Sequence, residues 1–269
     1  DAMTLSAVII ILREVLEAAL VLSLLVSTTR LMALSYRGII GGFLLGLAGA
    51  ATATLLMDVI SESFDGMGQE VLNVVLLGAI VVLLLVYAAG LDRRADKGDG
   101  LMSSLLLVVS CLIVAMAITR EGMEIIIFMY GFSADPVEML PVLVGGAIGA
   151  GIGISLGVLI YYTLINLPER LVIIVPLLLL ALVASGMASQ AIVYLMQGGL
   201  IESQLPVWDT SGWIAETSVT GQLLYALLGY EATPTLMQVG VYGLTMTVFM
   251  LVIVAARWLR ETPNTRDVQ

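Results

Sequence analysis

The stretch Arg-Glu-Val-Leu-Glu at residues 13–17 returns as Arg-Glu-Gly-Met-Glu at residues 120–124. Each copy lies inside a long apolar run, at 5–27 and at 101–132, and puts one arginine and two glutamates where a membrane helix ordinarily has no charge. A charge at the centre of a membrane span costs about 2.5–3.5 kcal/mol on insertion scales, so such residues are candidates for a functional site. Within each motif the arginine shares a helix face with the second glutamate, and the first glutamate lies three residues before the second. Both carboxylates of a motif can therefore point into one cavity.

The composition predicts a polytopic membrane protein. Of the 269 residues, 60% are hydrophobic and 12% are charged, against about 25% charged residues in soluble domains. The chain has no histidine and a single cysteine, Cys111, which excludes histidine-ligated zinc, copper and haem, Glu-x-x-His di-iron sites and an intrachain disulfide. We expect no permanently bound cofactor and no nucleic-acid partner. A transported metal would bind carboxylate, hydroxyl, carbonyl, amide or thioether groups.

Seven apolar runs are long enough to span a lipid bilayer, which takes about 20 residues. They lie at residues 5–29, 38–60, 70–91, 101–131, 141–166, 171–199 and 235–259. We therefore predict an all-α polytopic membrane protein with seven transmembrane helices in a single membrane domain over residues 1–269.

The basic residues predict the orientation of these helices. Nine of the eleven lie in the links after the first, third and fifth runs or in the tail, all on one side of the predicted membrane: Arg30, Arg37, Arg93, Arg94, Lys97, Arg170, Arg257, Arg260 and Arg266. Short loops rich in Lys and Arg stay in the cytoplasm. The N-terminus is therefore predicted outside and the C-terminus inside.

Residues 4–97 and 101–200 are predicted to be two copies of one three-helix unit. An offset of 107 positions carries the first charged motif onto the second and Val86-Tyr87 onto Val193-Tyr194. It also carries the glycines at 38, 42 and 46 onto those at 145, 149 and 153. Three spans per copy give the second copy the opposite orientation. In inverted-repeat transporters the substrate site lies near the midplane between the copies, so the two motifs are expected to face each other.

The glycine stripes have two interpretations. Glycine at every fourth position makes a smooth helix face on which another backbone can approach closely. We expect the stripes to pack helices within one protomer, with a subunit interface as the alternative. The last run and the tail, residues 235–269, lie outside the repeat.

The links on the predicted outer side are acidic and carry no Lys or Arg. Glu62, Asp65 and Glu70, near the start of the third run, are candidates for a relay that leads a cation to the membrane site. The alternative is an ordinary solvated loop surface. Asp135 and Glu138 contribute to the same acidic side.

Residues 201–234 are predicted to form an outer loop. Trp208 marks the membrane interface, a helix start is expected at Asp209-Thr210-Ser211, and residues 213–229 are expected to be an amphipathic surface helix that acts as a lid. In the sixth run, Ser189 and Gln190 either hydrogen-bond between helices or line the pathway.

The two motifs together carry four carboxylates and two guanidinium groups, with a formal charge of −2. Such a site suits a cation, and oxygen ligands suit a hard cation such as ferric iron, with ferrous iron, manganese, magnesium and calcium as alternatives. The candidate ligands are Glu14, Glu17, Glu121 and Glu124, their charge partners are Arg13 and Arg120, and Met123 is apolar filler or lines the pathway. Proton coupling through the crowded carboxylates is a further expectation.

Three other uses of these charges compete with a carrier. They are helix clamps made of Arg–Glu pairs, a passive cation channel, and an intramembrane enzyme that uses paired carboxylates. An inverted repeat favours a carrier over an enzyme, because alternating access needs two equivalent halves. The arginine in each motif disfavours free conduction.

The doubled Arg-Glu-x-x-Glu in a seven-span chain resembles the Ftr1-type, oxidase-dependent iron permease family. Trp208–Ser211, Gly186–Ala188 and Gly229-Tyr230 extend the resemblance over most of the chain. The resemblance implies iron uptake, as Fe(III) or Fe(II), across the plasma membrane or bacterial inner membrane, with the glutamate pairs carrying the ion. It also implies an extracytoplasmic ferroxidase or related iron-oxidising partner. Val15 and Asp65 depart from the family pattern, which commonly has glycine and glutamate there, and other metals such as lead remain alternative substrates.

Overall fold

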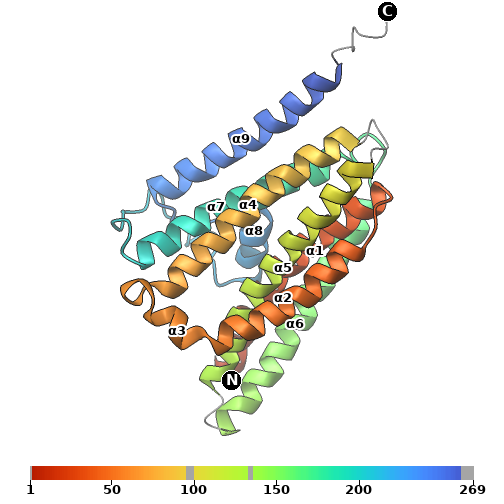
Figure 1. Ribbon diagram of the computed structural model, residues 1–269. Helices are drawn as coiled ribbons and strands as arrows, with labels where there is room; N and C mark the ends of the chain where they lie inside the picture. The colour runs from red at the N-terminus through yellow and green to blue at the C-terminus, as the bar shows by residue number, and fades with distance from the viewer. Residues whose placement is uncertain (1, 95–99, 133–135, 262–269) are drawn as a thin grey trace, which may run out of the picture.

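The computed structural model describes residues 2–94, 100–132 and 136–261. Over these residues the chain is built from helices (Figure 1). Their bounds are α1 Ala2–Leu31, α2 Arg37–Leu55, α3 Met57–Glu62, the 3-10 turn η1 Phe64–Gly66, α4 Gly68–Arg94, α5 Gly100–Gly131, α6 Pro136–Ile165, α7 Ile174–Gln197, α8 Val219–Leu228 and α9 Leu236–Glu261. The all-helical class is as the sequence predicts.

Six of these helices are long and apolar enough to cross a membrane: α2, α4, α5, α6, α7 and α9. Helix α1, with 30 residues, is also long enough, but it carries the charged motif of residues 13–17 in its middle. Large apolar side chains on the outward faces of the six helices are exposed, for example Leu44 at 62% and Leu251 at 62%. Exposed leucines on apolar helices of this length are where lipid would replace water.

The second predicted span, 38–60, ends earlier than expected. Helix α2 ends at Leu55, and the chain restarts as α3. The carbonyl oxygen of Ile60 lies only 1.5 Å from the place that a Cβ atom on Gly68 would occupy. Because Gly68 has no side chain, the end of α3 can pack closely against the start of α4.

Helices α1 and α6 pack along each other, and so do α2 and α5, while α4 lies on α7 and α9 covers both (Figure 1). Glycines make the first two pairs close: a Cβ on Gly42 would lie 2.4 Å from the carbonyl oxygen of Cys111, and one on Gly145 would lie 2.4 Å from that of Thr4. Both stripes therefore pack helices inside one chain, as expected.

A buried apolar core fills one half of the bundle. It runs along the second half of α1 and the facing parts of α4, α5 and α7, and includes the fully buried Leu24, Leu84 and Tyr87. The Tyr87 hydroxyl is hydrogen-bonded to Thr28 Oγ1 at 2.9 Å. This half ends near Arg30, whose guanidinium donates to the Tyr161 hydroxyl at 2.8 Å. The core thus closes the bundle on the side where α1 ends.

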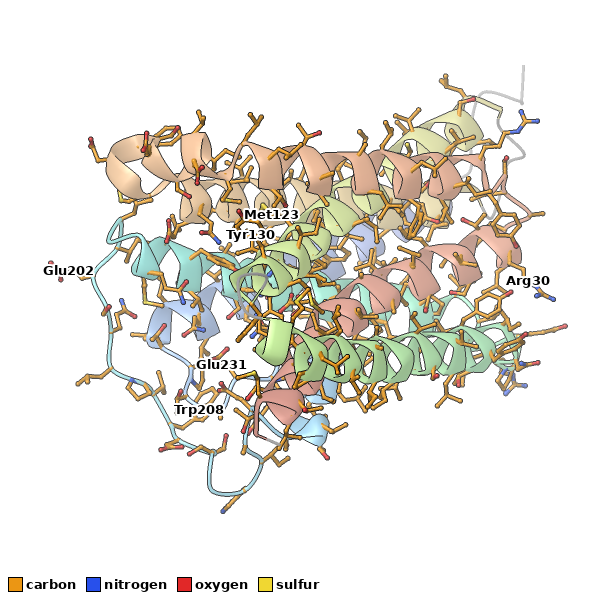
Figure 2. The ribbon with its side chains drawn as sticks, turned by 90° about the horizontal axis from the view of Figure 1, so that it is seen from below. Arg30, Met123, Tyr130, Glu202, Trp208 and Glu231 are labelled. Carbon is orange, nitrogen blue, oxygen red and sulfur yellow. The ribbon has the colours of Figure 1, made fainter. Side chains whose placement is uncertain are left out.

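Residues 198–235, here called the connecting segment, lie at the other end of the bundle. Figure 2 shows Glu202, Trp208 and Glu231 there, on the opposite side from Arg30. The helix start expected at Asp209 is wrong, because Asp209 Oδ1 accepts from the Ser211 backbone N–H in a local turn, at 2.9 Å. Helix α8 begins only at Val219, where Ser218 accepts from the Gly221 N–H at 3.0 Å as its cap.

Helix α8 is not a surface lid. It contacts both α1 and α7, and its Gly221, Gln222 and Ala226 are buried. Gly229 ends it in the left-handed conformation, with φ of 66°, and turns the chain back toward α9. The predicted amphipathic helix is thereby shortened from 213–229 to ten residues and inserted into the bundle beside the charged motifs (Figure 1).

Three of the charged residues named in the sequence analysis lie outside the described residues: Lys97, Asp135 and Arg266.

Candidate cation-binding site

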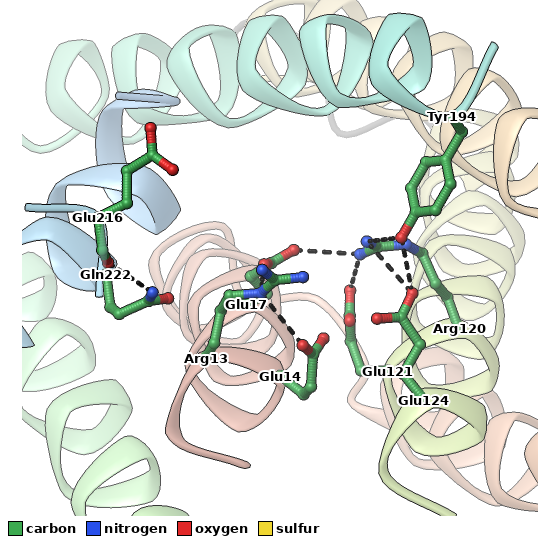
Figure 3. A network of polar contacts seen from close by, with 9 residues as sticks. All are labelled: Arg13, Glu14, Glu17, Arg120, Glu121, Glu124, Tyr194, Glu216 and Gln222. Carbon is green, nitrogen blue, oxygen red and sulfur yellow. Dashed lines mark hydrogen bonds and ion pairs between the residues drawn. The ribbon is translucent and has the colours of Figure 1, made fainter. Parts of the chain in front are cut away.

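Three glutamates from two helices meet inside the bundle. One carboxylate oxygen from each of Glu14 on α1 and Glu121 and Glu124 on α5 lies within 4.8 Å of the others. The cluster is drawn in Figure 3. At a rise of 1.5 Å per residue, it lies about 18 Å along α1 from its start and about 10–15 Å along α5 from its end. We call these three residues the glutamate cluster.

Arg120 holds the cluster from the α5 side. Its side chain is completely buried, and Nη1 donates to Glu17 Oε2 at 3.1 Å and also contacts the Glu121 carboxylate. Nη2 lies 3.6 Å from Glu124 Oε1. The hydroxyl of Tyr194 on α7 donates to the same Glu124 oxygen at 2.9 Å (Figure 3). One guanidinium therefore touches three carboxylates.

Arg13 occupies the matching position on the α1 side but is 36% exposed. Its Nε donates to Glu14 Oε1 at 3.1 Å and lies 3.6 Å from Glu17 Oε1. The ring of Tyr225 on α8 lies 5.7 Å from the guanidinium carbon, within the range of a cation–π contact. Arg13 is thus paired to its own helix and to α8.

Glu17 differs from the other three motif glutamates. Its carboxylate lies between the two guanidinium groups, 3.1 Å from Arg120 and 3.6 Å from Arg13. It joins α1 to α5 through Arg120. Of the four glutamates expected to share one place, three converge and the fourth links the arginines.

The glutamate cluster has oxygens with no hydrogen-bond partner among the described residues. They include Glu14 Oε2 and Glu121 Oε2, both in buried side chains. A buried acceptor without a partner costs about 1–3 kcal/mol, more if it is charged. A cation among these oxygens would supply what the protein does not, and carboxylate oxygens are the ligands that hard divalent cations take.

One cavity reaches the glutamate cluster, and a second cavity adjoins the first; both include residues of the connecting segment. The wide cavity, about 360 Å³, is bounded by Arg13, Glu14, Glu124, Thr217 and Gln222, with apolar walls from α1. The side cavity, about 170 Å³, shares Arg13 and Gln222 with it and adds residues of α7 and of the connecting segment. The wide cavity thus borders Glu14 and Glu124 directly, and Arg13 and Gln222 separate it from the side cavity.

The residues proposed to line the pathway have different surroundings. Gln190 lines the side cavity, and Ser189 lines a separate cavity of about 280 Å³ next to Trp208. Met123 is completely buried and lines none of the cavities described at this site, which fits apolar filler.

The three acidic residues proposed as a relay do not line these cavities, although Glu70 lies close to Gly198, the neighbour of the cavity-lining Gln197. Glu62 and Asp65 are exposed, and Glu70 is half-buried beside Gly198 at the end of α7. None of the three lines the wide or the side cavity within the described chain.

Several residues of the site escaped the sequence analysis. Tyr194 was visible only as the partner of Tyr87 at the 107-residue offset. Gln222 and Tyr225 lie in α8, in a stretch interpreted as a lid, and no spacing in the sequence ties them to the motifs. Glu216 and Glu231 were expected only as members of the acidic outer side, with a solvated loop surface as the alternative.

Glu216 and Glu231, here called the outer glutamate pair, both line the side cavity. Burial and, next to it, the charge of Glu216 raise the pKa of Glu231 to about 7, against the opposing effect of Arg13. Glu216 Oε1 accepts from the Ala232 backbone N–H at 2.7 Å, which fixes it beside the turn that carries Glu231. The pair is thus a second, shallower group of carboxylates.

Comparison with known proteins gives a consistent family. The sequence model of the iron permease FTR1 family matches residues 103–264 of this chain. The chain is 26% identical over 252 residues to the ferrous iron permease EfeU of Escherichia coli O6:H1, covering 87% of this chain and 89% of the relative. It is 28% identical over 254 residues to the ferrous iron permease EfeU of Yersinia pestis, covering 87% of each.

A third relative, the ferrous iron permease EfeU of Shigella sonnei, is 27% identical over 255 residues, covering 87% of this chain and 89% of the relative. No solved structure matches the chain. The relatives are named as permeases, and the apolar helices together with this family indicate a multi-pass protein of the plasma membrane. Because the family match covers more than half of the chain, the protein belongs to the iron permease FTR1 family.

Proposed function

We propose that this protein carries iron across the membrane by binding the ion at the glutamate cluster. The observation that carries the proposal is the convergence of three carboxylates from two helices within 4.8 Å, with oxygens left unpaired in the described structure. Family membership in the iron permeases supports iron as the cargo. Helix clamps made of Arg–Glu pairs need no convergence of three carboxylates from two helices.

Each charged residue has a distinct role in this proposal. Glu14, Glu121 and Glu124 are the ligands, and Glu17 holds Arg120 against them. The four glutamates and two arginines sum to −2, so a divalent ion makes the site neutral. When the ion binds, its charge replaces the guanidinium contacts on Glu14 and Glu124, and the arginines are released toward Glu17 and the cavity.

The cargo is proposed to be Fe(II). The relatives in Escherichia coli, Shigella and Yersinia are named ferrous iron permeases. Fe(III), which suits hard oxygen ligands, is the alternative, delivered by an extracytoplasmic ferroxidase or related iron-oxidising partner. Competition by Mn²⁺, Mg²⁺ and Pb²⁺ measures how far the oxygen-only site discriminates among cations.

We propose α1 as the seventh span, with the N-terminus outside. Supporting this, α1 lies along the full length of the apolar α6, and its charges face α5 and α8 rather than the outer surface. Arg30, Arg37 and Arg170 lie in or beside links at the same end of the bundle, and the acidic connecting segment lies at the other. The connecting segment is then extracytoplasmic.

The inverted repeat is supported by the packing. If the second copy repeats the first, α5 corresponds to α1 and α6 corresponds to α2. The pair α1–α6 then corresponds to the pair α5–α2, and both pairs are packed through glycine stripes. In the contacts, Cys111 follows Thr4 by 107 positions, as Arg120 follows Arg13, but Gly145 follows Gly42 by 103. The two glycine-packed helix pairs therefore differ in register by four residues, about one helical turn.

Iron uptake into proteoliposomes tests the proposal. Fe(II) kept reduced and Fe(III) would be supplied separately to wild type, Glu121→Gln and Glu169→Gln, the last being exposed at the opposite end. Loss of a ligand is expected to lower uptake of one iron species by about tenfold or more, while Glu169→Gln transports normally. Undiminished uptake by a correctly folded Glu121→Gln protein would refute the role of the cluster.

A further inference from the structure

Asn73 on α4 is a buried amide whose polar atoms are unused. The residue is 1% exposed, and neither its Oδ1 nor its Nδ2 has a hydrogen-bond partner in the part of the chain that the structure describes. An asparagine in a helix can bond the carbonyl oxygen four residues before it, as Asn166 does with Tyr162 at 2.7 Å. Because two unpaired buried polar atoms weaken the fold, Asn73 is a candidate for a functional role.

Asn73 lies one helical turn from a close contact between α4 and α7. A Cβ atom on Gly198 would lie 3.3 Å from Glu70 Cβ, so the two backbones approach closely there. The two helices run in opposite directions (Figure 1). One turn along each helix from this contact leads to Asn73 on α4 and to Tyr194 on α7. Since Asn73 is buried, it belongs to the same layer of side chains as Tyr194.

Tyr194 connects this layer to the glutamate cluster. Its hydroxyl donates to Glu124 Oε1 at 2.9 Å and accepts from Arg120 Nη2 at 3.4 Å (Figure 3). The Arg120 guanidinium carbon lies 6.0 Å from the centre of the Tyr194 ring. Arg120 is completely buried, and its Nε donor has no hydrogen-bond partner among the described residues. An unused amide acceptor and an unused guanidinium donor therefore occur in the surroundings of one tyrosine.

A cation in the glutamate cluster would leave Arg120 short of hydrogen-bond acceptors. In the described structure, its guanidinium pairs with the carboxylates of Glu17, Glu121 and Glu124. A cation bound by the cluster takes oxygens of Glu121 and Glu124, so the guanidinium keeps Glu17 and loses the other two. A buried charge that loses its acceptors is costly. The long side chain of Arg120 therefore needs another acceptor nearby.

An amide oxygen suits this task because it is neutral. A further carboxylate beside Arg120 would draw the guanidinium away from the cluster in the empty protein, whereas an amide receives it only after a cation has displaced it. We propose that Asn73 is a positioning residue whose Oδ1 accepts the Arg120 guanidinium while an oxygen-preferring divalent cation occupies the glutamate cluster. This role rests on the proposed function, because it requires the cation at the three carboxylates.

Binding of Mn²⁺, a redox-stable divalent probe, to the full-length protein in detergent tests this role. Electron paramagnetic resonance of free Mn²⁺ gives the affinity, and thermal unfolding of metal-free samples gives the stability. Asn73→Leu removes both polar atoms at similar volume. It is expected to weaken Mn²⁺ binding about tenfold, while the melting temperature of the metal-free protein stays the same or rises. Unchanged Mn²⁺ affinity, or a lower melting temperature, would overturn the proposal.

Two variants separate the acceptor from the general effect of changing a buried polar residue. Asn73→Asp keeps an acceptor oxygen in either protonation state and is expected to bind Mn²⁺ at least as tightly as wild type. Ser185→Ala is the matched control, because the Ser185 hydroxyl is buried on α7 and donates to the Ala181 carbonyl oxygen at 2.7 Å. Its Mn²⁺ affinity should equal that of wild type. Binding as weak in Asn73→Asp or in Ser185→Ala as in Asn73→Leu would refute the acceptor role.

A double-mutant cycle tests whether Asn73 acts through Arg120. In Arg120→Gln, isolated as the folded fraction by size-exclusion chromatography, the guanidinium is absent. Adding Asn73→Leu to this variant is therefore expected to change Mn²⁺ affinity little. A further tenfold loss, about as large as in wild type, would mean that Asn73 acts on the cation without Arg120, contrary to the proposal.

Glu121→Gln in the same titration distinguishes this role from the proposed function. It is expected to lose Mn²⁺ binding, because it removes a ligand of the cluster. If Glu121→Gln loses the ion and Asn73→Leu binds it as wild type does, the role of Asn73 is rejected and the cluster stands. If Glu121→Gln binds Mn²⁺ as wild type does, the proposed function is rejected, and the role of Asn73 with it.

Discussion

The two copies of the charged motif have the same charged residues but opposite surroundings. Arg120 is completely buried and touches three carboxylates and Tyr194, whereas Arg13 is 36% exposed and rests on Tyr225 of α8. A buried ion pair loses several kcal/mol when one partner is removed, while a partly solvated pair loses far less. The comparison distinguishes a buried, closely paired half of the site on α5 from a partly exposed half on α1, which rests on α8.

Arg120→Gln is expected to have the largest effect. It leaves Glu17, Glu121 and Glu124 without their shared guanidinium, and removing one partner of a buried pair costs about 3–5 kcal/mol. We expect a large fall in the yield of folded protein and in its melting temperature in detergent. The matched variant Arg13→Gln should fold nearly as well as wild type. Equal destabilisation by the two variants would remove the distinction between the motifs.

Variants of two glutamates test the difference between the motifs more directly. Glu124→Gln is expected to remove a cluster ligand and abolish one Mn²⁺ equivalent, while Glu17→Gln, which links the arginines instead, should retain Mn²⁺ binding but lower stability. Titration with Mn²⁺ and thermal unfolding of the same samples separate the two effects. The assignment of roles fails if Glu17→Gln loses the ion and Glu124→Gln keeps it.

The tyrosines test the same contrast with smaller changes. Tyr194 donates its hydroxyl to Glu124 at 2.9 Å, so Tyr194→Phe removes a hydrogen bond to a charged group, worth about 1.5–3 kcal/mol. Tyr225 contacts Arg13 through its ring face, and phenylalanine keeps a ring there. We therefore expect iron uptake to fall several-fold in Tyr194→Phe and to change little in Tyr225→Phe. Tyr225→Leu removes the aromatic ring beside Arg13 and is the variant of this residue that should lower iron uptake.

The elements differ in how well the sequence predicted them. Long apolar runs and the charges inside them were sufficient to predict six long apolar helices and the meeting of the motifs through Glu17 and Arg120, because charged side chains are costly inside an apolar bundle unless they bind each other or a ligand. The break at Leu56 was missed, because no proline or glycine within residues 50–60 marks it. The insertion of α8 was missed because its polar residues have partners far away in the sequence.

The division of roles among the four glutamates was also beyond the sequence. Glu17 and Glu124 occupy equivalent positions in the two motifs, and what separates them is the rotation of each helix and the neighbour it meets. Tyr194 reaches Glu124 from α7, whereas Tyr87, its equivalent by sequence, is hydrogen-bonded to Thr28 at the closed end. Equivalence in the sequence therefore gave the location of the site but not the function of each half.

The smallest expected effect concerns Glu231 on the access side. Its pKa is about 7, raised by burial and by Glu216 against the opposing charge of Arg13, so the folded protein holds a proton there that the unfolded chain releases near pH 4.5. Stability from this group is therefore complete at low pH and is lost as the pH rises through 7. In metal-free protein, the melting temperature of wild type should fall from pH 5 to pH 8 by more than that of Glu231→Gln. Parallel curves would show that Glu231 is solvated, and the access side would then lack the buried carboxylate that sets it apart from an ordinary acidic loop.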